Sequence, residues 1–588
     1  MQKECSVRTN IVLLFFFLIL GGILSSVLKY ELLWDFTNYH YFNPWAFLNG
    51  RINYDVGVAG MNAFFNPLPD IPLYLLIKYF NDYPNFICFV QGMWFGALLF
   101  LFFKIVCQVV DTSTRVGKLQ VFVILLVGAT GWSTFMQIGT STNEIQISVF
   151  IMAGLYVLLK EMYSSKQNKW LFLLSGLLLG MAMGLKLTAV TYCVSSALAV
   201  FLYYRRLERP LEKIFFFAVG GISGFLIFNG FWMYILWEHF QNPFFPFANE
   251  IFKSEYASVS NVRDVRFLPK DIWEALLNPL LIFKKGISLA SDGNFAGEGN
   301  NFIIDYRPVF SFIGLLGLIV FYLKEKICRR EFCLKFDSVM GFLLVWVVIS
   351  YVLWMFLFNI IRYIVPIEML LSIFIIVPMF KFYPQKDISR VLYIVLCNFI
   401  LFLLLSTPYF SNSWGSRNIR KVNYDLNAVD DESTVYFSKF AGEKFVFMED
   451  VDIPDNALIY IYEYPSAAVL PYLYDIAGKK NIRGVSVHQL MYYTTQKGKV
   501  IDYYDYNPQW KKLKEEALHD YDENRPVIAV SAGNTNDPLG ILQKMYCRQI
   551  PTNLGALMLC VPHELKDKVW KRFLENSKKI EDMNLGEK

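Results

Sequence analysis

Hydrophobic residues lie in long uninterrupted stretches in the first two thirds of the chain, separated by short polar segments. A helix needs about 20 apolar residues to cross a bilayer core about 30 Å thick. About eleven stretches approach that length: 10–29, 85–110, 119–139, 144–160, 170–187, 188–204, 214–236, 308–324, 338–357, 364–383 and 391–408. The pattern predicts a polytopic α-helical membrane protein.

Composition supports this class and excludes others. Hydrophobic residues make up 55% of the 588 positions, charged residues only 18%, and the mean hydropathy is +0.36. An average soluble chain is about 25% charged, so several soluble domains would lack a polar surface. Aromatic residues reach 17%, a bias expected where rings sit at membrane interfaces. A net charge of +5 is too small to indicate a nucleic-acid partner.

Basic residues concentrate in alternate loops and predict the orientation. If the N-terminus is cytoplasmic, the loops around 115, 166, 206, 330 and 388 are cytoplasmic and rich in Lys and Arg, as the positive-inside rule requires. An odd number of helices then places the C-terminal part outside. Lys3 and Arg8 precede a first stretch that is long for a signal peptide and has no A-x-A site, so an uncleaved helix is expected. The chain is expected in the inner (plasma) membrane.

Two regions follow from this pattern. Residues 1–408 form the membrane part, with long external loops at about 30–84 and 237–307. Residues 409–588 are polar enough for an external, periplasmic domain. Its expected elements are strands at 457–462 and 527–530, a helix from 507 to 521, a helix over 538–546 and an apolar run at 556–561. Alternating strands and helices predict a soluble α/β domain.

Cysteine positions add one expectation for this domain. The nine cysteines are mostly scattered in or beside apolar segments. Cys547 and Cys560 both fall in the external domain, where a disulfide can persist.

Ionisable residues gather at the predicted external ends of the helices. Transporters and channels usually carry charged groups near the bilayer midplane, and these helices have almost none there. The external ends instead carry Asp35, His40, Glu144, Lys186, Glu238, His239 and Arg362. This indicates a site at the outer membrane–water boundary, suited to a reaction between a lipid-borne substrate and a molecule outside.

Two carboxylates are the catalytic candidates. Asp35 follows the first helix among aromatic rings, where partial desolvation would raise its pKa and make it a better base; the alternative is a solvated Asp in an aromatic belt. Glu144 is a second carboxylate, or else closes a capping box with Ser141. Together Asp35 and Glu144 could bind a divalent cation, Mg²⁺ or Mn²⁺. Asp70 is expected to cap a short helix.

The remaining candidates would bind substrate. They are His40, Lys186, His239, Arg263, Arg266, Arg362 and Tyr363. Arg362 suits phosphate because its planar fork bonds two oxygens, whereas its structural alternative is a salt bridge with Glu368. Lys186 could simply extend to the head groups. His40 could carry protons or only line the interface, and the Arg263–Arg266 segment could bind phosphate or form surface ion pairs.

These features in order resemble the GT-C superfamily, polytopic glycosyltransferases that include protein O-mannosyltransferases and the aminoarabinose transferase of lipid A. The likeness covers roughly 10–408 and rests on Asp35, the segment 66–69, Glu144, the Gly184–Lys186 element and the Arg362–Pro366 element. Many members carry an Asp-Glu pair in the first loop, where this chain has Asp35 and then Phe36. The position before Glu144, commonly Asp, is Asn143.

The resemblance implies transfer of a hexose or pentose from a polyprenyl-phosphate donor to a glycan, lipid or protein acceptor, with inversion. It implies Asp35 as general base and basic side chains at the departing phosphate. Three alternatives stay open. One is a polymerase or ligase acting on polyprenyl-linked glycans, the second is a flippase or transporter of lipid-linked glycans, and the third is a catalytically inactive relative whose C-terminal domain carries the function.

Overall fold

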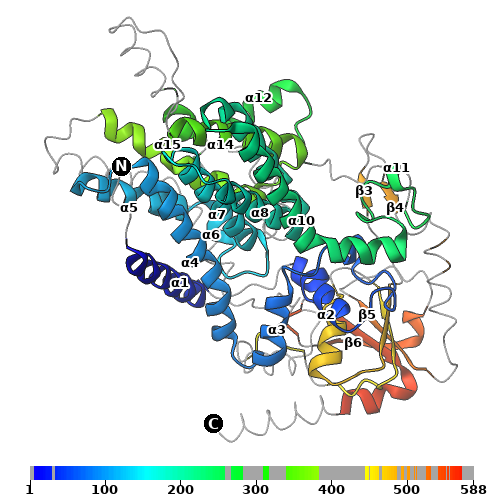
Figure 1. Ribbon diagram of the computed structural model, residues 1–588. Helices are drawn as coiled ribbons and strands as arrows, with labels where there is room; N and C mark the ends of the chain where they lie inside the picture. Colours follow the sequence, from blue (N-terminus) through cyan, green and yellow to red (C-terminus); the bar gives the residue numbers. More distant parts are fainter. Residues whose placement is uncertain are drawn as a thin grey trace, which may run out of the picture.

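The computed structural model describes residues 6–28, 34–257, 267–281, 339–382, 444–448, 451–462, 466–486, 525–531, 541–550, 552–554 and 557–571, with short pieces within 307–316 and 492–512. It has a helical part and a smaller domain built on a β-sheet, at lower right in Figure 1.

Long apolar helices make up the helical part. They are α1 (Val7–Leu28), α4 (Pro84–Val109), α5 (Arg115–Ala129), α7 (Glu144–Met162), α8 (Lys169–Leu185), α9 (Val190–Tyr203), α10 (Pro210–Phe240), α14 (Val339–Leu357) and α15 (Val365–Phe382). Within the described residues, six helical segments are long and apolar enough to cross a membrane. The chain is therefore a multi-pass membrane protein. The predicted stretches at 391–408 and most of 308–324 lie outside the described residues.

One predicted crossing, 119–139, is broken into two helices. α5 ends at Ala129, and the short α6 (Trp132–Met136) follows. The carboxylate of Glu368 on α15 accepts hydrogen bonds from the backbone N–H groups of Ser133 (3.0 Å) and Thr134 (2.8 Å), which satisfies the start of α6. A Cβ at Gly131 would lie 2.0 Å from that carboxylate, so a larger residue there would displace Glu368 from the start of α6.

Small residues set the closest helix contacts. α8 and α10 pack along most of α8, with a Cβ built on Gly180 only 2.0 Å from the Gly221 carbonyl oxygen and one on Gly220 2.1 Å from that of Leu173. Helices in lipid associate without a hydrophobic driving force, because the lipid tails are as apolar as the side chains. Backbones that approach this closely gain van der Waals contacts that stabilise the pair instead. The packing holds α8 and α10 side by side along most of α8.

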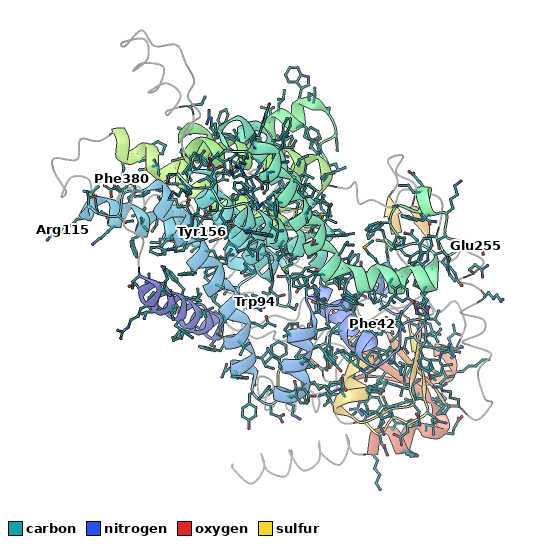
Figure 2. The ribbon with its side chains drawn as sticks, viewed as in Figure 1. Phe42, Trp94, Arg115, Tyr156, Glu255 and Phe380 are labelled. Carbon is teal, nitrogen blue, oxygen red and sulfur yellow. A yellow bond between two sulfur atoms is a disulfide. The ribbon has the colours of Figure 1, made fainter. Side chains whose placement is uncertain are left out.

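The first loop is compact and mostly helical. It contains the π-helical turn η1 (Phe36–His40), α2 (Phe42–Leu48), the 3₁₀ turn η2 (Gly60–Phe64) and α3 (Ile71–Phe80). Figure 1 shows α2 and α3 between the helical part and the sheet domain. Phe42 on α2, labelled in Figure 2, is buried there.

The C-terminal domain is built on a five-stranded sheet of order β2-β1-β5-β7-β6. β1 (Leu458–Ile461) pairs in parallel with β2 (Arg483–Ser486) and β5 (Val527–Ser531), whereas β7 (Leu557–Pro562) is antiparallel to β5 and to β6 (Met545–Ile550). A separate pair joins β3 (Tyr492–Thr494) and β4 (Val500–Asp502). The two predicted strands, at 457–462 and 527–530, are confirmed.

Two further expectations for this domain have an outcome. Cys547 and Cys560 form the disulfide, directly across the β6–β7 pair. The helix predicted over 538–546 is wrong where it is described: Leu542–Lys544 is a 3₁₀ turn, and Met545 and Tyr546 begin β6. Sheet pairing with β7 outweighs the local helical spacing there. Nearly all of the predicted helix 507–521 lies outside the described residues.

The first loop and the sheet domain are joined by buried polar contacts. Arg51 donates two hydrogen bonds of 2.7 Å to Asp55 and a third, of 2.8 Å, to the carbonyl of Ile482 in the sheet domain. Asp55 accepts from the Gly484 N–H at 2.6 Å, and Val56 forms a parallel bridge with Val485 of β2. The first loop thereby extends the edge of the sheet.

The sheet domain lies at one end of the helical part. In Figure 2, Arg115 at the start of α5 and Phe380 near the end of α15 lie at the opposite end from the sheet domain. Since Arg115 belongs to a basic loop expected in the cytoplasm, this arrangement agrees with a sheet domain on the other face of the membrane.

Candidate active site

Four charged side chains meet at the end of the helical part nearest the sheet domain. Arg362 Nη1 donates a hydrogen bond of 2.6 Å to Asp35 Oδ2, and its Nε lies 3.8 Å from Glu144 Oε1. Lys186 Nζ binds the same Glu144 Oε1 at 2.5 Å. Residues from four separate segments thus form one alternating network of two carboxylates and two cations.

Each of these residues stands where a helix begins, ends or changes geometry. Asp35 precedes η1, Glu144 opens α7, and Lys186 is the extended residue between α8 and the 3₁₀ turn η3 (Leu187–Ala189). Arg362 lies in the 3₁₀ turn η5 (Ile361–Ile364) before α15. Breaks in apolar helices bring these polar groups together.

The network is buried. Asp35 and Glu144 are each 5% exposed and Arg362 is 8% exposed. Charges removed from water are tolerated when each has a close partner of opposite sign, as here. Burial by itself would raise the pKa of Asp35, but Arg362, His40 and Lys186 outweigh it and lower that pKa. The expectation of a raised pKa was wrong because the sequence did not reveal the guanidinium beside Asp35.

The ring of Tyr363 lies beside both cations of the network. Its ring centroid lies 5.2 Å from Lys186 Nζ and 5.3 Å from the Arg362 guanidinium carbon, within reach of cation–π attraction. The salt bridge considered for Arg362 forms with Asp35. Glu368, the partner considered from the sequence, caps α6 instead. The carbonyl of Arg362 accepts hydrogen bonds from the Ser133 hydroxyl (3.0 Å) and the Gln137 amide (2.9 Å), which fix the η5 backbone.

A second polar group adjoins the network. His40 Nδ1 lies 2.7 Å from Asp70 Oδ1, and the Asn143 amide donates to the same oxygen at 2.8 Å. Asp70 occupies the predicted N-cap position of α3, but its side chain makes no capping hydrogen bond there. The Ser141–Glu144 capping box does not form either, because Asn143 is the N-cap of α7 and no side chain bonds there.

The structure does not bring the remaining candidates into the charged network. His239 lies exposed in the last turn of α10, whereas His40 is buried. Arg263 and Arg266 lie outside the described residues. The sequence did not predict Asn143 as a site residue or Asp70 as the partner of His40. The only local signals were that Asn143 precedes Glu144 and that Asp70 follows the proline-rich segment 66–69.

The donor set does not match a divalent-cation site. Mg²⁺ and Mn²⁺ prefer several oxygen ligands. Asp35 and Glu144 already bind Arg362 and Lys186, whose positive charges would oppose a metal ion between them. No group of three His, Cys, Asp or Glu that could hold a metal occurs in the part of the chain that the structure describes. Metal binding by these carboxylates stays a prediction, and no step below uses it.

Comparison with known proteins rests on structure alone. No family model and no curated protein matches the sequence. Among solved structures, ArnT from Cupriavidus metallidurans, solved bound to undecaprenyl phosphate, superposes with a TM-score of 0.53 at 11% identity, covering 94% of this chain and 98% of ArnT. This chain has an ArnT-like fold. The arabinofuranosyltransferase AftD from Mycobacteria matches more weakly, with a TM-score of 0.38 at 12% identity over 78% of this chain and 30% of AftD.

The ArnT-like fold agrees with the order of elements expected from the sequence. An acidic residue follows the first helix, a helical first loop comes next, and a second acidic residue opens a later helix. A C-terminal sheet domain follows the membrane part. Nearly complete coverage of both chains shows that the helical part and the sheet domain both belong to the likeness.

Proposed function

We propose that this protein is a membrane glycosyltransferase that moves a sugar from a polyprenyl-phosphate donor to an acceptor on the external face, with inversion at the anomeric carbon. The observation that carries the proposal is the buried Arg362–Asp35 pair beside the Lys186–Glu144 pair. It supplies cations for a phosphate and a carboxylate for an acceptor hydroxyl within one network. The GT-C-like fold, shared with a protein solved with undecaprenyl phosphate, supports the same donor class.

Arg362 and Lys186 would hold the donor phosphate. A guanidinium can donate two parallel hydrogen bonds to phosphate oxygens. When the bond between the sugar and the phosphate breaks, its electron pair passes to the phosphate, and cations already in place stabilise that charge. Glu144 would keep Lys186 oriented, because their 2.5 Å contact fixes the ammonium group.

Asp35 would be the general base. As the acceptor oxygen forms its bond to the anomeric carbon, the hydroxyl proton passes to the Asp35 carboxylate. In the structure Arg362 holds Asp35 and lowers its pKa, which weakens it as a base. A donor phosphate competes for the same guanidinium, so donor binding would loosen the pair and strengthen the base. The acceptor would be a glycan, a lipid or a protein.

The reaction would take place on the external, periplasmic side of the inner (plasma) membrane, with the N-terminus in the cytoplasm. Two observations support this face. The sheet domain lies at the opposite end of the helices from Arg115 (Figure 2), and its Ala468 N–H donates a hydrogen bond to the carbonyl of Thr37, two residues after Asp35. Its Cys547–Cys560 disulfide fits an oxidising compartment.

Mass spectrometry of a deletion strain tests the function. We expect one polyprenyl-phosphate sugar to accumulate while one sugar residue disappears from an envelope glycan, lipid or protein. A plasmid copy of the wild type should reverse both changes, and a copy carrying Asp35→Asn should reverse neither. A polyprenyl-phosphate sugar pool and envelope glycans identical to those of the parent would contradict the proposal.

A further inference from the structure

His40 carries a buried nitrogen for which the described residues supply no hydrogen-bond partner. Its side chain is 2% exposed, and Nε2 has no donor or acceptor within reach in the described part of the chain. Buried polar atoms are almost always paired, and an exception calls for a ligand, a water or a strained site. The other ring nitrogen is firmly held, since Nδ1 lies 2.7 Å from the Asp70 carboxylate.

Asp70 fixes how His40 presents Nε2. An ionised carboxylate only accepts hydrogen bonds, so Nδ1 carries a proton. The Asn143 amide, bound to the same Asp70 oxygen at 2.8 Å, holds that carboxylate in place. The ring therefore cannot turn to bury Nε2 against the protein without breaking the Asp70 contact. The geometry therefore leaves Nε2 of His40 available to a group of a bound ligand.

His40 lies next to the charged network. The turn η1 is π-helical, with i to i+5 spacing, so Asp35 and His40 lie about one turn apart on the same side of it. Asn143, which binds Asp70, immediately precedes Glu144, which binds Lys186. His40 is thus placed close to Asp35 and to the start of α7, beside the charged network.

Two acceptor atoms in the same segments indicate the chemistry of that group. Asn38 Oδ1 on η1 and Glu144 Oε2 at the start of α7 are also buried, and no described residue bonds to them. Both accept hydrogen bonds only, so a phosphate oxygen would be repelled there. A hydroxyl donates to such atoms, and it can also donate to or accept from Nε2 whichever protonation state His40 has.

We propose that His40, positioned by Asp70 and Asn143, binds a ring hydroxyl of the donor sugar, with Asn38 and Glu144 accepting from neighbouring hydroxyls. The inference rests on the proposed function and assigns its sugar subsite. His40 would contact the substrate, whereas Asp70 would be a positioning residue. The subsite would let the enzyme bind a sugar-bearing lipid phosphate more tightly than the bare lipid phosphate.

Binding measurements on the full-length protein in nanodiscs test this. The probes are undecaprenyl phosphate and undecaprenyl phosphate carrying glucose, mannose, galactose or arabinose. We expect the wild type to bind at least one sugar-bearing lipid more tightly than the bare lipid. His40→Ala should lose that preference about tenfold, the effect of one buried hydrogen bond of about 1.4 kcal/mol, while keeping its affinity for the bare lipid.

Three controls separate the outcomes. Asp70→Asn retains the volume but replaces the charged acceptor of His40 Nδ1 by a weaker amide oxygen, so it should lose part of the preference without contacting the lipid. His40→Gln offers a further packed variant if His40→Ala unfolds, and unchanged binding of the bare lipid reports an intact fold. Arg362→Ala should weaken both lipids equally.

A full sugar preference in well-folded His40→Ala and His40→Gln would overturn the assignment of His40. Equal wild-type affinity for the bare lipid and every sugar-bearing lipid would overturn the sugar subsite while leaving a polyprenyl-phosphate site. Failure of the wild type to bind any of these lipids would overturn the proposed function as well.

Discussion

Arg362 donates a hydrogen bond of 2.6 Å to Asp35 although 327 positions separate them in the chain. The pair joins the segment after the first helix to the turn before α15, and both side chains are buried. In this state the guanidinium occupies the carboxylate that would act as base. A donor phosphate that took the place of Asp35 as the partner of Arg362 would free this carboxylate. Donor binding would then strengthen Asp35 as a base.

Asp35→Asn should lose about 10²–10⁴-fold in turnover, because general-base catalysis contributes that much and the amide cannot take the proton. The variant retains the shape of the side chain and should fold and insert normally. Glycan transfer in membranes, normalised to protein amount, measures the effect. Wild-type turnover by well-folded Asp35→Asn would refute the assignment of the base.

Arg362→Ala should weaken donor use by about 10- to 100-fold, the loss of a charge-assisted contact of about 1.5–3 kcal/mol. Arg362→Lys should rescue only part, since the ammonium group lacks the planar fork. The kinetic parameters for the polyprenyl-phosphate sugar check this. A normal KM and kcat for the donor in Arg362→Ala would leave Arg362 with a structural role alone.

Glu144→Gln and Lys186→Met should be coupled. Their 2.5 Å contact is buried on the Glu144 side, so each single change leaves the other residue with less charge compensation. A double-mutant cycle on kcat/KM should give a coupling energy of about 0.5–3 kcal/mol. Additive single effects would show that the pair does not act as a unit. Because no side-chain capping bond exists at the start of α7, Glu144→Gln should not act through lost capping.

Arg51→Ala should loosen the sheet domain from the first loop. It leaves Asp55 buried without its bidentate partner, a loss of about 3–5 kcal/mol for a broken buried pair. Limited proteolysis should then cut between the domains at lower protease concentration. The matched control is Arg483→Ala, an interface arginine in a more exposed hydrogen bond to the Tyr54 carbonyl, which should cost at most about 1 kcal/mol. Equal protease sensitivity of the two variants would contradict this role of Arg51.

Cysteine labelling checks the orientation. Asn456, exposed beside β1, replaced by Cys should react with an impermeant thiol reagent in intact cells. Ser113, exposed in the basic loop before α5, replaced by Cys should react only after the membrane is broken. The reverse pattern would invert the orientation and move the site to the cytoplasmic face.

Sequence alone determined the class of the protein and the main strands of its tail. Apolar length and the scarcity of charge in the helices follow from the cost of polar groups in lipid, which acts on every segment independently. The same cost keeps ionisable residues out of the helix interiors. The four residues of the charged network could therefore be predicted individually from the sequence, as charged residues at helix ends: Asp35, Glu144, Lys186 and Arg362. Local hydrophobic runs likewise marked β1 and β5.

Only the tertiary structure decided the partners. Which cation faces Asp35, whether Asp70 caps α3 or holds His40, and whether Glu368 binds Arg362 or caps α6 all depend on contacts between segments far apart in sequence. In each case a local capping or pairing pattern competed with a buried partner brought in by helix packing. For Asp70 the buried partner prevailed over the local cap, because a buried carboxylate needs a close partner. For Glu368 the unpaired N–H groups at the start of α6 were the partners that packing brought close.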